Sequence, residues 1–475
     1  MTLSLVLQAL APQLTLAAMG VLVLVLDRLL TQADKRRWLP RLAVGGLIGA
    51  LVATCLAWGD PTTAPVPLEI DRFALIVASL SLVALGLAIP LVTLYVRGHH
   101  HRQGAFYALL LLAGLALSLV GATLDLAVLL LALALLDLAT GLLISIPREA
   151  PAEVEIASRT VRYLTILSAI SLFGLSWLIG LGGSTNLAVL GERLTADGAP
   201  ARGLLIPALT LTVVGMTGRL AIFPFHRWLA DTLADAPTPV GVCFAVAQPI
   251  AGAAALARIL LTALPAGAPS ADWRTMLTAL AGLTMVAGGL VALWETDAKR
   301  FLAFLGIAQS GALLIGPATA TTGGLPAMWL TLLSHVLALT GALTALHAWQ
   351  AQTGSRSLAD CAGMHRRAPE LAWPLLVCLL SLVGLPPTAG FVGRLALYDA
   401  AIKDGLYWLA IVGGIGSVVG LAAVWRPIQA AFVAPAPRGR RLTLRHLTLA
   451  AIGLTGAGVL VAALYAGALL DFLAV

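Results

Sequence analysis

Three charged side chains lie inside long apolar stretches of the sequence. Asp137 sits within Leu135–Leu138, and Arg219 and Arg394 each lie a few residues from prolines. Inside a membrane a charge costs about 3 kcal/mol or more unless it is paired or hydrated, so such residues usually have a function. The Asp137 carboxylate can carry a proton along a hydrophilic path. It can also be the structural partner of a buried arginine, or an acid that stays neutral.

The two arginines differ from Asp137 because an arginine does not give up its proton in proteins. Arg219 and Arg394 can tune the pKa of a neighbouring carboxylate, or they can extend to the membrane surface. His335 can relay protons near neutral pH, or it can be a hydrogen-bonded core histidine. Gln309 can hold a water or bond to a neighbouring helix. The candidates for proton transfer are therefore Asp137, Arg219, Gln309, His335 and Arg394.

The remaining polar groups predict no catalytic residue, metal site or cofactor in this chain. His226 and Asp231 are expected at the membrane interface. The loop histidines His99–His101 have no carboxylate or cysteine to complete a metal site, so we expect them to be solvated. The four cysteines form no CxxC pair, which argues against zinc, iron–sulfur clusters and disulfides. The sequence also has no phosphate-binding loop and no dinucleotide fingerprint.

The composition indicates an integral membrane protein. Of the 475 residues, 60% are hydrophobic and 11% are charged, and the mean hydropathy is +0.96. Soluble domains carry about 25% charged residues, so a soluble enzyme is excluded. The first apolar stretch, residues 3–30, is too long for a cleaved signal and lacks a basic start, so we expect a retained span.

Stretches of about 20 apolar residues, long enough to cross a membrane, recur along the chain and predict an all-α membrane protein of about fourteen helices. No long hydrophilic segment separates them, so we expect one polytopic membrane domain over residues 1–475. The predicted spans are 4–30, 38–58, 73–96, 105–121, 123–146, 160–180, 203–223, 239–262, 275–294, 300–317, 326–350, 371–393, 406–432 and 446–470.

The basic residues predict the orientation. The net charge of +7 comes mainly from arginines in short loops between spans, which indicates membrane topology and not nucleic-acid binding. Most of the 29 basic residues lie in loops that follow the odd-numbered spans. The loops after even-numbered spans carry only five basic residues: Arg72, Arg193, Arg202, Arg274 and Lys403. Since basic loops stay in the cytoplasm, both termini are expected on the non-cytoplasmic side of a bacterial inner membrane.

Prolines predict that spans 7 and 12 are broken, at Pro224 and at Pro386–Pro387, and Pro249 in span 8 is a third candidate break. Interrupted helices in two halves of a chain are typical of transport folds with inverted repeats. We expect two inverted five-helix repeats, spans 4–8 and spans 9–13. The predicted segments are 1–100, 101–265, 270–432 and 433–475. Gly218–Ala221 and Gly393–Ala396 share the letters GRLA, each beside a break.

Several ordered motifs resemble the antiporter-like membrane subunits of respiratory complex I. The resemblance extends from about Leu10 to Arg426, and the chain length and the opening Ala11–Ala17 favour the subunit N type over the L and M types. The motifs are GRLAIFPFHRWL at Gly218–Leu229, DAPTPV at Asp235–Val240, DAKRFLAF at Asp297–Phe304 and LSLVGLPPTAGFVGR at Leu380–Arg394.

The resemblance implies proton translocation along a hydrated axis of glutamate, lysine and histidine residues. This chain departs from that pattern. The family's span-5 glutamate and span-7, span-8, span-10 and span-12 residues fall at Ala134, Arg219, Pro249, Gln309 and Arg394. Asp137 lies one helical turn after Ala134 and can stand in for the glutamate. Either Asp137 with Arg219 still gates protons, with His335 and Gln309 continuing the path, or the channel is closed and the subunit is structural.

The resemblance also implies the surroundings of the chain. We expect subunit N of a proton-translocating NADH:quinone oxidoreductase, packed against M-type and L-type antiporter-like subunits, small helical subunits and lipids. Flavin, iron–sulfur clusters, NADH and quinone are then expected on other subunits. The alternatives are a subunit of a multi-subunit cation/proton antiporter, of a bicarbonate-uptake complex or of a membrane-bound hydrogenase.

Overall fold

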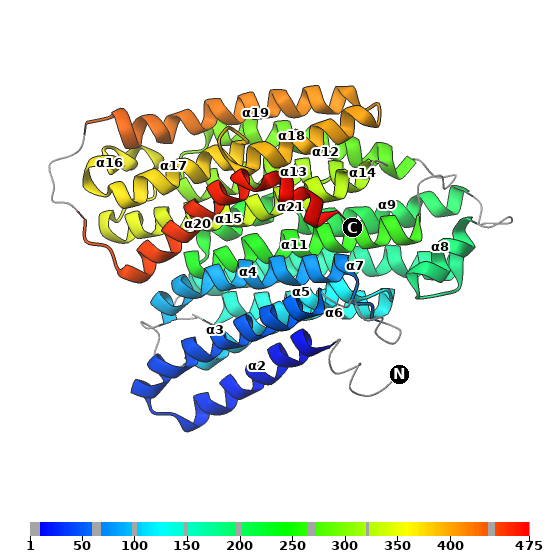
Figure 1. Ribbon diagram of the computed structural model, residues 1–475, viewed down its shortest axis with the longest axis horizontal. Coiled ribbons are helices and arrows are strands. Elements are labelled where there is room, and N and C mark those ends of the chain that lie inside the picture. Colours follow the sequence, from blue (N-terminus) through cyan, green and yellow to red (C-terminus); the bar gives the residue numbers. More distant parts are fainter. Residues whose placement is uncertain are drawn as a thin grey trace. The chain divides into compact units, whose positions relative to one another are not determined.

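The computed structural model describes residues 10–58, 68–96, 102–146, 151–195, 202–264, 272–319, 323–435 and 442–474. Helices make up nearly all of this part of the chain, and its β-structure is limited to isolated bridges (Figure 1). The predicted all-α fold is thereby confirmed. The loop with His99–His101 lies outside the described residues.

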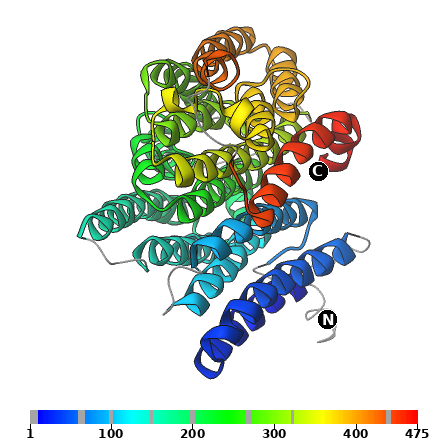
Figure 2. The ribbon, with the colours of Figure 1, turned by 90° about the vertical axis from the view of Figure 1, so that its left-hand side faces the viewer.

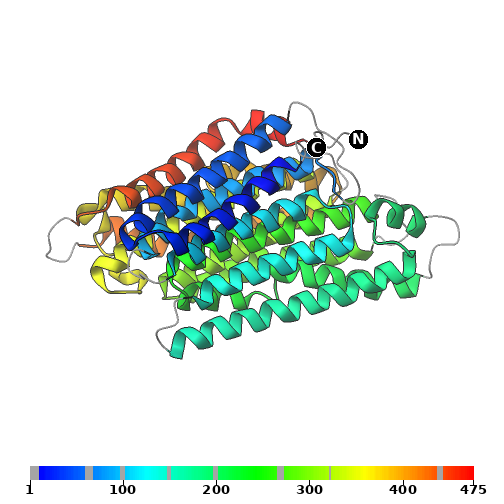
Figure 3. The same ribbon diagram turned by 90° about the horizontal axis from the view of Figure 1, so that it is seen from below.

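The first of two compact units contains Met1–Leu220 and Ala247–Trp273. Helices α2 and α3 lie side by side in it (Figure 2), and the 32-residue α7 packs along α9 (Figure 3). Its helices are α2 (Ala11–Leu29), α3 (Gln32–Ala57), α4 (Arg72–Val96), α5 (Gln103–Ala122), α6 (Leu126–Ser145), α7 (Pro151–Gly182), α8 (Leu187–Thr195) and α9 (Arg202–Arg219). Helix α11 (Thr238–Ala263) contributes its second part.

The second unit contains Ala221–Val246 and Arg274–Val475. Its core is α15, which packs against α13, α17, α18 and α20. The α-helices are α10 (Arg227–Asp235), α12 (Asp272–Trp294), α13 (Ala298–Leu313), α14 (Ile315–Ala318), α15 (Gly324–Thr353), α16 (Met364–Arg367), α17 (Pro369–Val383), α18 (Ala389–Lys403), α19 (Tyr407–Ile428), α20 (His446–Leu464) and α21 (Ala466–Leu473). A 3₁₀ turn (Leu358–Cys361) and a π turn (Gln429–Val433) complete the described helical segments.

Twelve of the described helices are long and apolar enough to cross a membrane. Two shorter apolar helices, Gly203–Arg219 and Pro369–Val383, are the ones that end at the predicted breaks. A polytopic membrane protein is confirmed. The count of fourteen spans and the two inverted repeats stay predictions.

Both predicted breaks at prolines 224 and 386–387 are present. Helix α9 ends at Arg219 and α10 begins at Arg227, while α17 ends at Val383 and α18 begins at Ala389. The two GRLA segments differ in position, however. Arg219 ends the helix before its break, whereas Arg394 lies on the helix after its break. The shared letters therefore do not mark equivalent positions.

The expected break at Pro249 is wrong. Helix α11 runs without interruption from Thr238 to Ala263, and Pro249 lies inside it. A proline in a helix removes only one backbone donor, and close packing of the surrounding helices lets the helix continue. Residues 238–260 of α11 are all buried, which supplies that packing. The lost bond leaves the carbonyl four residues earlier, that of Ala245, without its usual helical donor.

Small residues let α7 and α9 approach closely. A Cβ atom added to Gly215 on α9 would lie 2.2 Å from Ser171 Oγ and 2.8 Å from the Ser171 backbone nitrogen. A Cβ on Gly174 of α7 would lie 2.5 Å from the Thr212 backbone nitrogen. Small residues at the contact allow the backbones of two membrane helices to approach closely. This contact fixes the end of α9, where Arg219 sits, against the middle of α7.

Candidate functional site

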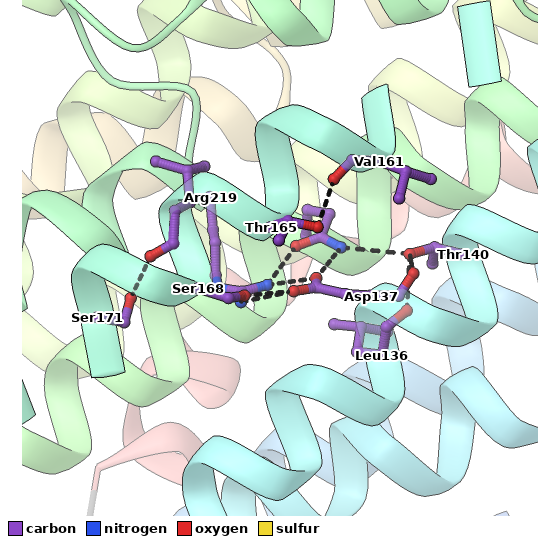
Figure 4. A network of polar contacts seen from close by, with 10 residues as sticks. Leu136, Asp137, Thr140, Val161, Thr165, Ser168, Ser171 and Arg219 are labelled. Carbon is purple, nitrogen blue, oxygen red and sulfur yellow. Dashed lines mark hydrogen bonds and ion pairs between the residues drawn. The ribbon is translucent and has the colours of Figure 1, made fainter. Parts of the chain in front are cut away.

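Asp137 and Arg219 form a buried ion pair within the first unit. Arg219 Nη1 donates to Asp137 Oδ1 at 2.6 Å, and Nη2 donates to Oδ2 at 2.8 Å. The arginine side chain is fully buried, and the aspartate side chain is 15% exposed. This two-pronged geometry is the strong form of an arginine–carboxylate contact. Two residues separated by 82 positions in the sequence thus meet in one site (Figure 4).

Two neutral side chains complete the surroundings of the pair. Ser168 Oγ on α7 donates to Asp137 Oδ2 at 2.6 Å and accepts from Arg219 Nη2 at the same distance. Gln248 on α11 accepts from Arg219 Nη1 through Oε1 at 3.1 Å, and its Nε2 donates to Asp137 Oδ1 at 3.2 Å. The same amide nitrogen reaches Thr140 Oγ1 at 3.4 Å.

The network fills the hydrogen-bonding capacity of the carboxylate. An ionised carboxylate offers about four lone-pair sites. Asp137 receives donors from both terminal nitrogens of Arg219, from Ser168 and from Gln248. A proton arriving on Asp137 must displace one of these donors and leave a buried arginine without its counter-charge. The geometry therefore favours a charge pair that stays paired.

The position on α6 explains why Asp137 occupies this site. Ala134, where the family pattern has its glutamate, is exposed, whereas Asp137 one turn later points to α7 and α9. Ser168 and Gln248 were not among the residues predicted from the sequence. Thr165, Ser168 and Ser171 form a polar line at three-residue spacing on α7, which was the available signal for Ser168. Gln248 was visible as a polar residue inside an apolar span.

A second group of polar residues lies buried in the second unit. Gln309 and Ser310 on α13 and His335 and Thr340 on α15 are all fully buried. Their side-chain polar atoms make no well-formed hydrogen bond to any residue in the described ranges. The His335 ring lies against α13, because a Cβ added to Gly306 would be 3.3 Å from its Cε1. The structure thus places Gln309 and His335 on neighbouring helices of the second unit.

Pro249 has a consequence for His335. Ala245, whose carbonyl lacks its helical donor at the proline, lies close enough for its backbone to act on the His335 ring. The Arg394 guanidinium lies within electrostatic range of the same ring. Pro249 thus leaves the buried Ala245 carbonyl without its helical donor, close to the His335 ring in the interior of the second unit.

Arg394 binds the end of the helix that precedes its own. Its Nη1 donates to the Val383 carbonyl and its Nη2 to the Leu382 carbonyl, each at 2.6 Å, and Nη1 also reaches Ser417 Oγ at 3.1 Å. Carbonyls at a helix C-terminus have no intrahelical donor, and a cation there also complements the helix dipole. Arg394 thus acts as a side-chain cap for α17 across the break.

Arg394→Leu is expected to lower the stability of the second unit by about 3 kcal/mol, because two buried carbonyls lose charged donors worth about 1.5–3 kcal/mol each. Thermal unfolding of the purified protein in detergent measures the loss. Lys403→Leu on the same helix is the control, since Lys403 forms an exposed pair with Asp399 and such pairs contribute little. Equal melting curves for the two variants would contradict the capping role.

A buried lysine in the DAKR motif was not among the predicted site residues. Lys299 Nζ donates to the Ala236 carbonyl at 3.2 Å. The next residue, Arg300, pairs with Asp231 at 2.7 Å and with Glu295 at 3.1 Å. Asp231, expected at the interface, is therefore held in a partly buried ion-pair network. His226 stacks on Phe223 beside this network.

No group of three or more His, Cys, Asp or Glu side chains in the described ranges is placed to hold a metal ion.

Comparison with known proteins assigns the fold to a family. Residues 123–420 match the family described as NADH:quinone oxidoreductase/Mrp antiporter, transmembrane. The chain is 35% identical over 414 residues to NADH-quinone oxidoreductase subunit N of Heliobacterium modesticaldum, covering 86% of each protein.

Solved structures agree with this assignment. A chain of respiratory complex I from Thermus thermophilus with bound aureothin is 28% identical, with a TM-score of 0.81 over 98% of this chain and 99% of that one. A chain of the Mrp complex from Dietzia sp. is 20% identical, with a TM-score of 0.85 over 100% of this chain and 97% of that one, which shows the fold alone. The chain therefore belongs to the family of antiporter-like membrane subunits of NADH:quinone oxidoreductases and Mrp antiporters, where subunit N is among its relatives.

Proposed function

We propose that this chain is the subunit N component in the membrane arm of a proton-translocating NADH:quinone oxidoreductase. The support is the 35% identity to a named subunit N over 86% of both chains. The chain itself contributes no redox site, and flavin, iron–sulfur clusters, NADH and quinone bind to other subunits. Its partners are the other antiporter-like subunits and the small helical subunits of the arm.

The proposal includes the orientation and the repeats predicted from the sequence. Both termini lie on the non-cytoplasmic side of the inner membrane, and residues 101–265 and 270–432 form the two inverted repeats. A reporter active only in the periplasm, fused after Val475, should be active, while the same reporter in the loop after Arg356 should be silent. The reverse pattern would invert the orientation.

We further propose that the Asp137–Arg219 pair is a fixed electrostatic lock and not a proton-loading site. The observation that carries this is the saturated carboxylate: four donors hold Asp137. Arginine cannot release a proton to continue a relay. Moving a proton through the pair would separate two buried charges, which costs several kcal/mol. In this subunit the pair then sets the local field and holds α6, α7 and α9 together.

Asp137→Asn in the assembled complex tests the lock. We expect the number of protons translocated per electron pair to stay unchanged in reconstituted vesicles, because no proton passes through this carboxylate. Asp137→Asn/Arg219→Gln, which removes both charges, is the companion variant if the single change impairs assembly. A reduced ratio in a fully assembled complex would show that Asp137 carries protons.

A multi-subunit cation/proton antiporter is the second candidate, since the fold matches a chain of the Dietzia Mrp complex. Purification from native membrane, with identification of every copurifying chain, separates the two. Flavin and iron–sulfur subunits support the proposal, and their consistent absence beside antiporter subunits overturns it. Nickel–iron subunits would indicate a membrane-bound hydrogenase.

A further inference from the structure

A long apolar groove opens on the outer surface of the first unit. Helix α5 forms its floor, because both α2 and α6 pack on α5. Its volume is ≈ 510 Å³, within the usual range of 300–1,000 Å³ for ligand pockets. One arginine, Arg102, lies in the lining. The other lining residues are aliphatic or glycine: Leu16, Ala17, Gly20, Val21, Leu24, Ala105, Ala108, Leu109, Leu112, Leu115, Leu142 and Ile146.

One end of the groove is positively charged. Arg102 is exposed there, and its Nη1 donates to the Ile146 carbonyl at 3.3 Å. Within the described ranges no carboxylate lies within ion-pair distance of Arg102. The neighbouring acid, Asp27, is already engaged, since it accepts from the Gly104 backbone nitrogen at 3.2 Å and pairs with Lys35 at 3.4 Å. Among the described residues, the charge of Arg102 therefore has no acidic partner, and this arginine lies at the end of the groove.

The length of the groove matches one leaflet of a membrane. Along α5 the lining runs from Arg102 to Leu115, which at 1.5 Å per residue is about 20 Å. Half of a bilayer including its headgroup region is about 20–22 Å. The arginine at one end and aliphatic side chains along the rest thus follow the order of a phospholipid, with the headgroup first and the acyl chain after it.

We propose that this groove binds an anionic phospholipid, with its phosphate on Arg102 and an acyl chain along α5 between α2 and α6. Arginine is well suited to the phosphate because its fixed fork of donors matches phosphate oxygens. The acyl chain of the lipid packs along a row of aliphatic side chains, and inside a membrane such van der Waals packing is what favours association. The site does not depend on which complex contains the subunit.

Native mass spectrometry of the purified complex tests the site. The complex is delipidated and then titrated with phosphatidylglycerol or phosphatidylcholine of the same chain length. Arg102→Gln should weaken phosphatidylglycerol binding about tenfold. It should weaken phosphatidylcholine binding less, because the choline group of that lipid already balances the charge of its phosphate. Arg162→Gln is the control, since Arg162 forms an exposed pair with Glu155 on α7 away from the groove.

Gly20→Leu tests the acyl-chain part. A Cβ at Gly20 meets nothing closer than 3.9 Å, so the leucine extends into the groove without a backbone clash. We expect loss of one bound lipid of either headgroup. Gly45→Leu is the matched control, because a Cβ there has no neighbour within 4 Å and Gly45 does not line the groove. Equal lipid binding by the two glycine variants would overturn the proposal. So would crosslinks from Leu109 that capture only a neighbouring subunit.

Discussion

Arg219→Met should be among the most damaging single substitutions in this chain. It leaves Asp137 partly buried and without its cation, and removing one member of a buried pair costs about 3–5 kcal/mol. We expect a marked fall in the thermal unfolding midpoint of the purified protein and a smaller yield of assembled complex. The effect comes from the uncompensated charge, because methionine fills much of the volume of the arginine stem.

The double variant Asp137→Leu/Arg219→Met separates charge from packing. Replacing a buried ion pair by apolar residues of similar volume is often neutral or stabilising. Gln248 and Thr140 still have each other as partners at 3.4 Å. The double variant should therefore recover most of the stability that the single variant loses. If the single and double variants were equally unstable, the pair would contribute to stability through the packing of its side chains and not through their charges.

Gly215→Ala should produce the second large effect, although it adds only one methyl group. The new Cβ would lie 2.8 Å from the Ser171 backbone nitrogen, so side-chain rotation cannot relieve the overlap. Overpacking of this kind costs about 1–3 kcal/mol, and more where backbone must move. Since Arg219 lies one turn later on α9, the separation of α7 from α9 also pulls its guanidinium away from Ser168.

Gly203→Ala is the control on the same helix, because a Cβ there meets nothing within 4 Å. Alanine is the better helix former, so this variant should be neutral or slightly stabilising. Thermal unfolding of both variants, with the yield of assembled complex, checks the difference. Similar melting temperatures for the two would show that α7 and α9 are not held at the distance described.

The sequence was sufficient for features that depend on local chemistry. Apolar length identified the helices, and prolines 224, 386 and 387 located both breaks. The cost of an isolated charge in an apolar span pointed to Asp137 and Arg219 before any contact was known. Pro249 could not be interpreted in this way. A proline breaks a helix only where the neighbouring helices do not keep the helix in place, and that packing depends on the tertiary structure.

The rest of the site depends on contacts between distant segments. Ser168 and Gln248 are 31 and 111 positions from Asp137, and no periodicity in the sequence links them. The paired GRLA segments were misleading for a related reason. Identical residues beside a proline do not show whether the arginine precedes or follows the break, and Arg219 and Arg394 have different roles. One neutralises an acid, whereas the other binds backbone carbonyls.

The contacts of Arg394 with the end of α17 also limit the motion of the broken helix. Swinging α18 away from α17 must break both guanidinium–carbonyl bonds, each worth about 1.5–3 kcal/mol. A difference of about 3 kcal/mol corresponds to a population ratio of roughly 150. Fewer than about one molecule in a hundred would then hold this joint open at any moment. The break thus interrupts the helical hydrogen bonds, but the two helices on either side of it stay together.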